Sequence, residues 1–186
     1  MKILAQIYYS HIVLGVAFLV YCYTYLSQTQ YAKIRRTLAL ENIIAFIILS
    51  IWRCAPPRLL PEECGFIDIL HDSRTGSAWT QNKFQLTIAA MPSLHFGNSV
   101  FIAFCLGRFS PHVVLRLLGV LWPFFMGVTV VATANHFLVD MVVGVIVISV
   151  AYWFNWAMLV LMPLQRVLFP LCRIEIDERE SRSTTP

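Results

Sequence analysis

The residues best suited to chemistry in this sequence are a histidine and an aspartate four positions apart, His136 and Asp140. In a helix, side chains at positions i and i+4 lie on one face and can interact. A carboxylate beside one imidazole nitrogen fixes the tautomer and raises the basicity of the other nitrogen, as a nucleophilic or general-base histidine requires. The alternative is a polar pair that closes a helix end. The apolar sequence around the pair favours function, because ionisable residues are costly to bury in a membrane.

A second polar cluster, Met-Pro-Ser-Leu-His, opens an earlier apolar stretch and ends at His95. Pro92 suits the first position of a helix, and Ser93 with the free backbone N–H groups near it would form an anion-binding helix start. His95, in the first turn, is placed to protonate a leaving oxygen. The alternative is a capped helix start with an incidental histidine.

Two further polar residues extend the set. Arg58 follows two prolines that stiffen the chain, and its guanidinium suits bidentate binding of phosphate oxygens, although an interfacial anchor is the alternative role. Asn135 either donates a hydrogen bond into the site or caps the last helix. His11 and His112 have no partner in sequence, so we expect structural roles for both.

The elements that must position these residues are membrane helices. Of the 186 residues, 58% are hydrophobic and 13% charged, whereas soluble domains carry about a quarter charged residues. A spanning helix needs roughly 20 apolar residues. We predict an all-α fold, a polytopic membrane helical bundle of about five transmembrane helices, in which Pro123 is tolerated as a kink. The predicted helices cover residues 3–27, 38–54, 91–106, 112–133 and 137–162.

The domain prediction follows from these spans. Residues 1–164 form one membrane domain, and residues 165–186 form a charged tail, disordered beyond about residue 176. The first span is too long for a signal peptide and lacks a cleavage site, so we expect it to be retained. Cys54 and Cys64 flank a proline-rich segment on one side, where a disulfide is an open alternative.

The basic residues predict the orientation. Nine of them fall on the side that holds the loops after the first and third helices and the C-terminal tail, and five on the other side. The positive-inside rule then places the C-terminus in the cytosol and the N-terminus outside. The larger set comprises Lys33, Arg35, Arg36, Arg108, Arg116, Arg166, Arg173, Arg179 and Arg182.

Numbered along the chain, the polar clusters are the first at residues 55–61, the second at 91–95 and the third at 133–140. An up-down order of five helices brings all three to one face of the bilayer, the non-cytosolic one. Together they predict a phosphate pocket with one arginine, one helix N-terminus, two histidines and one carboxylate. Zinc is the rival ligand, but there is no H-E-x-x-H motif and Arg58 would repel a cation. We therefore expect no metal and no cofactor. The other ionisable residues of the 55–88 segment are expected to be solvated loop charges: Asp68, His71, Arg74 and Lys83.

The ordered motifs resemble a known family. The segments Ala-Pro-Pro-Arg-Leu-Leu-Pro, Ala-Met-Pro-Ser-Leu-His and Asn-His-x-x-x-Asp, over residues 35–160, resemble the superfamily of type 2 phosphatidic acid phosphatases and vanadium haloperoxidases. They are most similar to its inositol phosphorylceramide synthase-like branch. The resemblance implies a helical bundle and metal-free chemistry. It implies His95 as general acid, His136 as the nucleophile that becomes phosphohistidine, Asp140 as its partner, and Ser93 and Arg58 as phosphate-binding residues.

The sequence also departs from the superfamily. There is no lysine six or seven residues before Arg58, and Val130 stands where the superfamily has an arginine six residues before the nucleophile. Arg74 or Lys83 could replace that charge. Members usually have about six helices, so with five this chain either lacks a first helix or pairs with another copy as a homo-oligomer.

These features predict a membrane-embedded lipid phosphatase or phosphotransferase that acts through a phosphohistidine. Its expected partners are a lipid phosphate or prenyl diphosphate substrate and membrane lipids, and no nucleic acid. One alternative is a non-hydrolytic enzyme, such as a prenyl diphosphate cyclase, that reuses the diphosphate pocket. Another is a lipid-binding protein that kept the fold and lost the activity.

Overall fold

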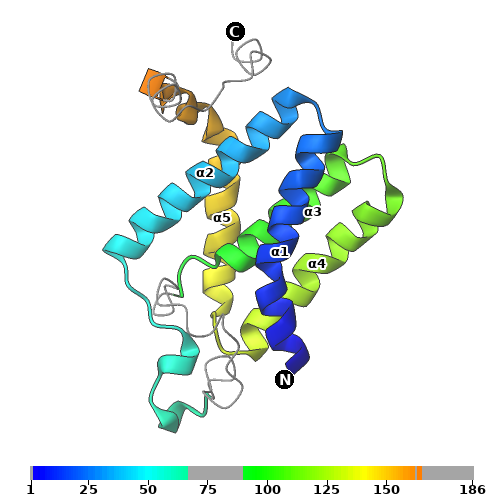
Figure 1. Cartoon of the computed structure of the whole chain (residues 1–186). Helices are drawn as coiled ribbons and strands as arrows, with labels where there is room; N and C mark the ends of the chain where they lie inside the picture. Colours follow the sequence, from blue (N-terminus) through cyan, green and yellow to red (C-terminus); the bar gives the residue numbers. More distant parts are fainter. Residues whose placement is uncertain (1, 67–89, 162, 165–186) are drawn as a thin grey trace.

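The chain folds as a bundle of helices. A computed structural model describes residues 2–66, 90–161 and 163–164, and within these residues it contains helices and no strands, which confirms the predicted all-α class. The long helices are α1 (Lys2–Tyr25), α2 (Gln28–Ile51), α3 (Leu94–Phe109), α4 (Val113–Ala132) and α5 (Leu138–Phe154) (Figure 1). Short 3-10 turns are η1 (Pro57–Leu59), η2 (Glu62–Cys64) and η4 (Asn155–Leu161).

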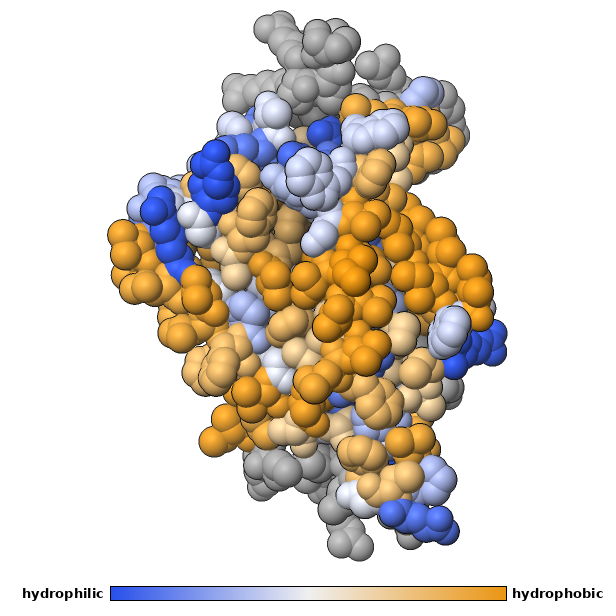
Figure 2. Space-filling view, turned by 180° about the vertical axis from the view of Figure 1, so that it is seen from behind, coloured by the Kyte–Doolittle hydropathy of each residue, from blue (hydrophilic) through white to orange (hydrophobic). Residues whose placement is uncertain are grey.

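The bundle belongs in a membrane. Within the described part of the chain, three spans are long and apolar enough to cross a bilayer: Ile3–Tyr25, Val113–Ala132 and Leu138–Leu161. Large apolar side chains are exposed along them, and Figure 2 shows a broad apolar surface on one face of the molecule. The protein is therefore an integral membrane protein. By contrast, α3 has 16 residues, or about 24 Å, which is less than the roughly 30 Å of a hydrocarbon core.

The second helix begins ten residues earlier than the apolar pattern predicts. Ser27 and Gln30 form a capping box, in which the Ser27 side chain accepts from the Gln30 N–H and the Gln30 side chain accepts from the Ser27 N–H. The basic cluster therefore lies inside α2 rather than in a loop. Its Lys33 ammonium lies 4.0 Å from the centre of the Tyr152 ring, a cation–π contact between α2 and α5.

The helices alternate in direction, so their ends gather at two poles of the bundle (Figure 1). Helix α3 packs between α4 and α5, α2 crosses α5, and α1 lies along α4. The starts of α1, α3 and α5 share one pole with the ends of α2 and α4. The buried core lies nearer the opposite pole and comprises Phe18, Cys22, Ile34, Phe101, Ile102, Cys105 and Ile148.

Two glycines set the distance between α3 and α5. A Cβ at Gly144 would overlap the carbonyl oxygen of Ser93, and a Cβ at Gly97 would lie 2.8 Å from the carbonyl oxygen of Gly144. No other residue type fits at either position without moving a backbone. This close crossing holds the start of α3, with His95, against the first turns of α5, with Asp140.

Substituting Gly144 by alanine should therefore separate these helices. We expect Gly144→Ala to destabilise the protein in detergent by about 1–3 kcal/mol, as overpacking typically does. The measurement is the unfolding midpoint of the purified protein, followed by size-exclusion chromatography after heating. Gly107→Ala is the matched control, because nothing lies within 4 Å of a Cβ there. Equal midpoints for the two variants would contradict the close crossing.

Candidate active site

The three polar clusters of the sequence meet at one pole of the bundle, as the helix order predicts. Main-chain hydrogen bonds join them in pairs, so their relative positions do not depend on flexible side chains. These bonds run from Ala90 N to Cys54 O (2.8 Å), from Arg58 N to Ala134 O (3.0 Å) and from Ser93 N to Asp140 O (3.0 Å).

His136 is buried at the centre of this junction, and its tautomer follows from its partner. The Nδ1 atom lies 2.7 Å from the carbonyl oxygen of Ala90. A carbonyl oxygen only accepts hydrogen bonds, so Nδ1 donates, and in the neutral ring this tautomer leaves the lone pair on Nε2. The Asp140 Oδ2 atom is 3.8 Å from Nδ1, which is too long for a hydrogen bond but close enough to stabilise a positive imidazole. Asp140 instead accepts from the Phe137 N–H at 2.7 Å, at the start of α5.

His95 lies in the first turn of α3 and faces His136. Their ring centres are 6.2 Å apart. Helix α1 covers the other side of His95: the Tyr8 ring stacks on it at 4.2 Å between centres, and the His11 ring lies at 5.1 Å. His95 is thus held between an aromatic wall and the second histidine, which restricts its rotamers and orients it toward His136.

The start of α3 differs in detail from the prediction. The helix begins at Leu94, with Ser93 as its N-cap, so Pro92 precedes the cap rather than occupying the first helical position; the Met91–Pro92 peptide bond is cis. The Ser93 side chain is fully buried and accepts from the Phe96 N–H at 3.5 Å. Its hydroxyl therefore caps its own helix, whose positive end points into the junction.

Arg58 and Asn135 interact directly. The Arg58 Nε–H donates to Asn135 Oδ1 at 3.0 Å, and the Asn135 amide donates to Thr133 Oγ1 at 2.7 Å. Of the two roles considered for Asn135, capping of the last helix is therefore not observed, because Phe137 holds the N-cap position of α5. The amide oxygen instead holds the Arg58 side chain next to Asn135, the residue that precedes His136.

Val130, which replaces the expected arginine, contributes through its main chain. Its side chain is fully buried, and its carbonyl oxygen accepts from the backbone N–H groups of Asn135 and His136. The turn that follows depends on Ala134, whose φ of 53° is in the left-handed region that non-glycine residues rarely adopt. This turn ends α4 and delivers His136 into the site.

Sequence reasoning missed several contributors. Nothing in the sequence marks Ala90, because its role is played by a carbonyl oxygen. Tyr8 and His11 are three positions apart on α1, a spacing that shares a helix face and could have been noticed. Glu41 is fully buried in α2 near Gly97, and within the described chain neither of its carboxyl oxygens has a hydrogen-bond partner. A lone carboxyl group in an apolar stretch was a visible signal of a special position.

Some predictions fall elsewhere. Asp68, His71, Arg74 and Lys83 lie outside the described residues, as does the tail of residues 165–186. Cys54 and Cys64 are both free thiols. No group of three or more His, Cys, Asp or Glu residues placed to hold a metal ion occurs in the part of the chain that the structure covers.

The fold and site define a class: integral membrane proteins of the helical-bundle type in which two histidines, a carboxylate and an arginine converge at one pole. A family model described as the PAP2 superfamily matches residues 1–154, and the chain belongs to this superfamily. Members are generally phosphatases or phosphotransferases, so membership indicates activity of the phosphatase type. No curated protein and no solved structure gives a significant match to the chain.

The left-handed turn at Ala134 gives a test of the local backbone. Ala134→Gly should raise stability by about 1 kcal/mol, because glycine adopts this conformation without the Cβ penalty. Ala134→Val should lower stability, because a β-branched side chain resists positive φ. Thermal unfolding of both variants in detergent measures the difference. A midpoint for the glycine variant well below that of the parent would show that this backbone conformation is absent.

The reactivity of the Cys54 thiol tests whether the chain just before the first cluster lies near Asp140 of the third cluster. Burial and the negative charge of Asp140 raise the pKa of the Cys54 thiol above its usual value. Since the thiolate is the reactive form, Asp140→Asn should lower that pKa and speed alkylation of Cys54 by iodoacetamide at a fixed pH near 8. The measurement uses protein that carries Cys64→Ser and Cys172→Ser, so that alkylation at Cys54 is followed. Glu63→Gln is the control for loss of an exposed carboxylate. An unchanged alkylation rate in Asp140→Asn would contradict the closeness of Cys54 and Asp140.

Proposed function

We propose that the protein transfers a phosphoryl group from a lipid phosphate or diphosphate ester through a phosphohistidine on His136. The observation that carries the proposal is the hydrogen bond from His136 Nδ1 to the Ala90 carbonyl at 2.7 Å. It leaves the Nε2 lone pair available to attack phosphorus, and the Asp140 carboxylate nearby stabilises the positive charge that the ring gains.

His95 supplies the leaving-group proton. It is the neighbouring imidazole, with its ring centre 6.2 Å from that of His136, so one phosphoryl group can lie between the rings. In the first step Nε2 of His136 bonds to phosphorus, the bond from phosphorus to the lipid oxygen breaks, and a proton on His95 moves to that oxygen. In the second step the oxygen of water or an alcohol bonds to phosphorus, the bond from phosphorus to Nε2 of His136 breaks, and the proton of the attacking hydroxyl moves to His95.

Positive groups around the histidines support binding of phosphate. Arg58 is held by Asn135, and the N-terminus of α3 begins at Ser93 beside them. A guanidinium and a helix N-terminus both stabilise an anion, and their value is greatest when they are fixed before the reaction. Ser93, Asn135 and Arg58 are therefore proposed to bind the phosphate group of the substrate. The proposed mechanism uses no metal ion.

The same residues serve hydrolysis and transfer, so the acceptor defines the reaction. The three motifs resemble most closely the inositol phosphorylceramide synthase-like branch, which favours an alcohol acceptor. The distribution of basic residues supports an active site at the non-cytosolic face. Lys33, Arg35 and Arg108 lie at the pole opposite the histidines, and the positive-inside rule places basic residues in the cytosol.

Histidine variants test the mechanism. The assay measures phosphate release or transfer in vesicles from phosphatidate, a prenyl diphosphate and an inositol lipid. His136→Ala should lose activity by about 10³-fold or more, and His95→Ala by about 10²–10⁴-fold for substrates with a poor leaving group. His112→Ala, an exposed histidine at the other pole, is the matched control and should stay active.

Labelled substrate provides a second readout. Rapid quenching should trap an acid-labile phosphate on His136 in the wild-type protein and in His95→Gln, but not in His136→Ala. Full activity in the histidine variants, or cyclised hydrocarbon instead of a free alcohol among the products of a prenyl diphosphate, would refute phosphohistidine chemistry.

A further inference from the structure

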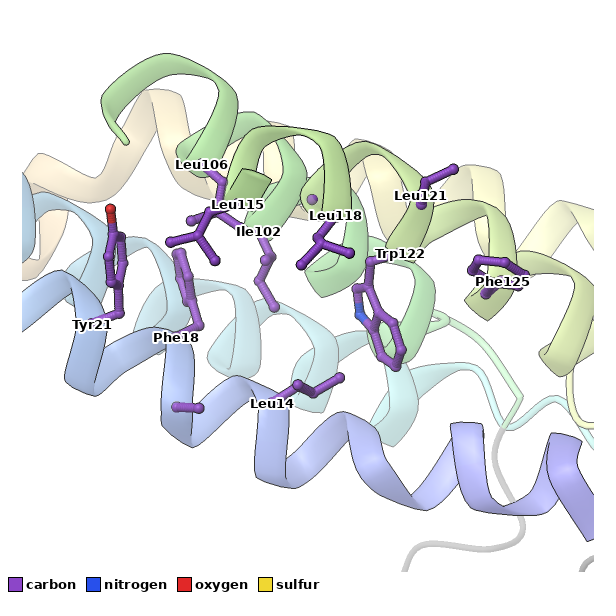
Figure 3. Close-up of a pocket in the computed structure, with 12 residues that line it drawn as sticks. Leu14, Phe18, Tyr21, Ile102, Leu106, Leu115, Leu118, Leu121, Trp122 and Phe125 are labelled. Atoms are coloured by element: carbon purple, nitrogen blue, oxygen red, sulfur yellow. The ribbon is translucent and has the colours of Figure 1, made fainter. Parts of the chain in front are cut away.

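An apolar groove adjoins the site on the side of α1. Its volume is about 390 Å³, within the range of small-molecule sites, and it lies between α1, α3 and α4 (Figure 3). Its floor is buried and includes Phe18, Ile102 and Gly119, whereas its rim includes the exposed side chains of Leu14 and Leu118. The groove is thus open along the bundle surface and lined almost entirely by hydrocarbon.

The groove begins at Leu14, one helical turn along α1 from His11. On α1, Tyr8, His11, Leu14, Phe18 and Tyr21 follow one another at spacings of three or four residues and so share one face. The first two contact His95, and the last three line the groove over about 10 Å of helix.

Trp122 on α4 completes the connection. It lines the groove, and its ring lies parallel to that of His11 with 6.4 Å between ring centres. His11 in turn touches His95. Figure 3 shows Trp122 and Leu14 in the same part of the groove, while Tyr21 lies toward the far end.

Two polar atoms at this junction have no partner. His11 Nδ1 and Trp122 Nε1 are buried, and in the described residues neither makes a hydrogen bond. A buried indole N–H without an acceptor is unfavourable, so a native structure usually supplies one from a ligand or water. The oxygen of a carboxylic ester, ether or amide group that lies between the phosphate ester and a hydrocarbon chain would meet this need at this place.

We propose that the groove holds one hydrocarbon chain of the substrate lipid, with a carboxylic ester, ether or amide oxygen, located between the phosphate ester and the chain, at Trp122 and His11. The proposal rests on the proposed function for the position of the phosphate. A lipid with a polar linkage between phosphate and chain fits both parts of the junction. A prenyl diphosphate, whose chain carries no such oxygen, leaves the Trp122 N–H unpaired.

Filling the groove is the first test. Leu118→Trp places bulk on the rim of the groove, whereas Leu117→Trp is the matched control, because Leu117 is exposed and does not line the groove. We expect Leu118→Trp to lower kcat/KM for a long-chain phosphatidate at least about tenfold while sparing a four-carbon alkyl phosphate. Leu117→Trp should leave both values unchanged. Equal chain-length preference in Leu118→Trp and wild type would overturn the proposal.

The junction has its own variant. Trp122→Phe removes the N–H and keeps an aromatic ring. Wild type should prefer a long-chain acyl lysophosphatidate to an alkyl phosphate of equal length, and the variant should lose most of that preference. If Trp122→Phe keeps the preference for the acyl lysophosphatidate over the alkyl phosphate, the proposed hydrogen bond from the Trp122 indole to the lipid is refuted.

A binding test that needs no turnover separates this proposal from the proposed function. A phosphatidate with a diazirine near the end of one chain is photolysed with the full-length protein in vesicles, and labelled peptides are mapped. Labelling of α1 and α4 that excess phosphatidate displaces, and that Leu118→Trp abolishes, supports the groove even if no phosphate is released. Equal labelling by a phosphatidylcholine probe with the same diazirine chain would mean that a bulk lipid chain occupies the groove, which overturns the proposal.

Discussion

The hydrogen bond between the His136 imidazole and the Ala90 carbonyl is the interaction on which the site depends. It joins the third motif to the main chain just before the second, and Ala90 is itself fixed through its N–H to Cys54, just before the first. One residue without a functional side chain therefore links all three. A bilayer offers little water to satisfy irregular backbone, so the non-helical segments at this pole must satisfy one another. The bonds that meet this physical requirement are the same bonds that align the histidines.

The helical framework gives that junction its rigidity. Gly97 and Gly144 let α3 and α5 approach until main chain meets main chain, so the two helices that carry His95 and Asp140 are fixed as a pair. Helix α1 completes the site differently, through the rings of Tyr8 and His11. The polar and the apolar parts of the site therefore meet along a single face of α1.

The sequence predicts the broad features because strong physical signals encode them. Apolar length predicts membrane helices, alternation of direction predicts a shared face, and i, i+4 spacing predicts the His136–Asp140 pair. The predicted start of α2 was wrong because it was based on the apolar pattern and not on the Ser27–Gln30 capping box, which the sequence also contains. The Ala90 carbonyl and the left-handed turn at Ala134 could not be predicted, because backbone groups are present at every position and only the folded chain selects them. His11 was assigned a structural role because its partner, His95, is distant in sequence.

The main-chain frame has a consequence for how such a protein can diversify. Since the alignment of the histidines rests on N–H and carbonyl groups, Ala90, Val130 and Ala134 contribute through atoms that every residue carries, while burial and backbone conformation restrict their side chains to small or apolar ones. The geometry of the polar junction therefore depends on which side chains fit the available space and not on their functional groups. Exposed side chains between α1 and α4, such as those of Leu14 and Leu118, make none of these bonds, so they can differ while the junction keeps its geometry.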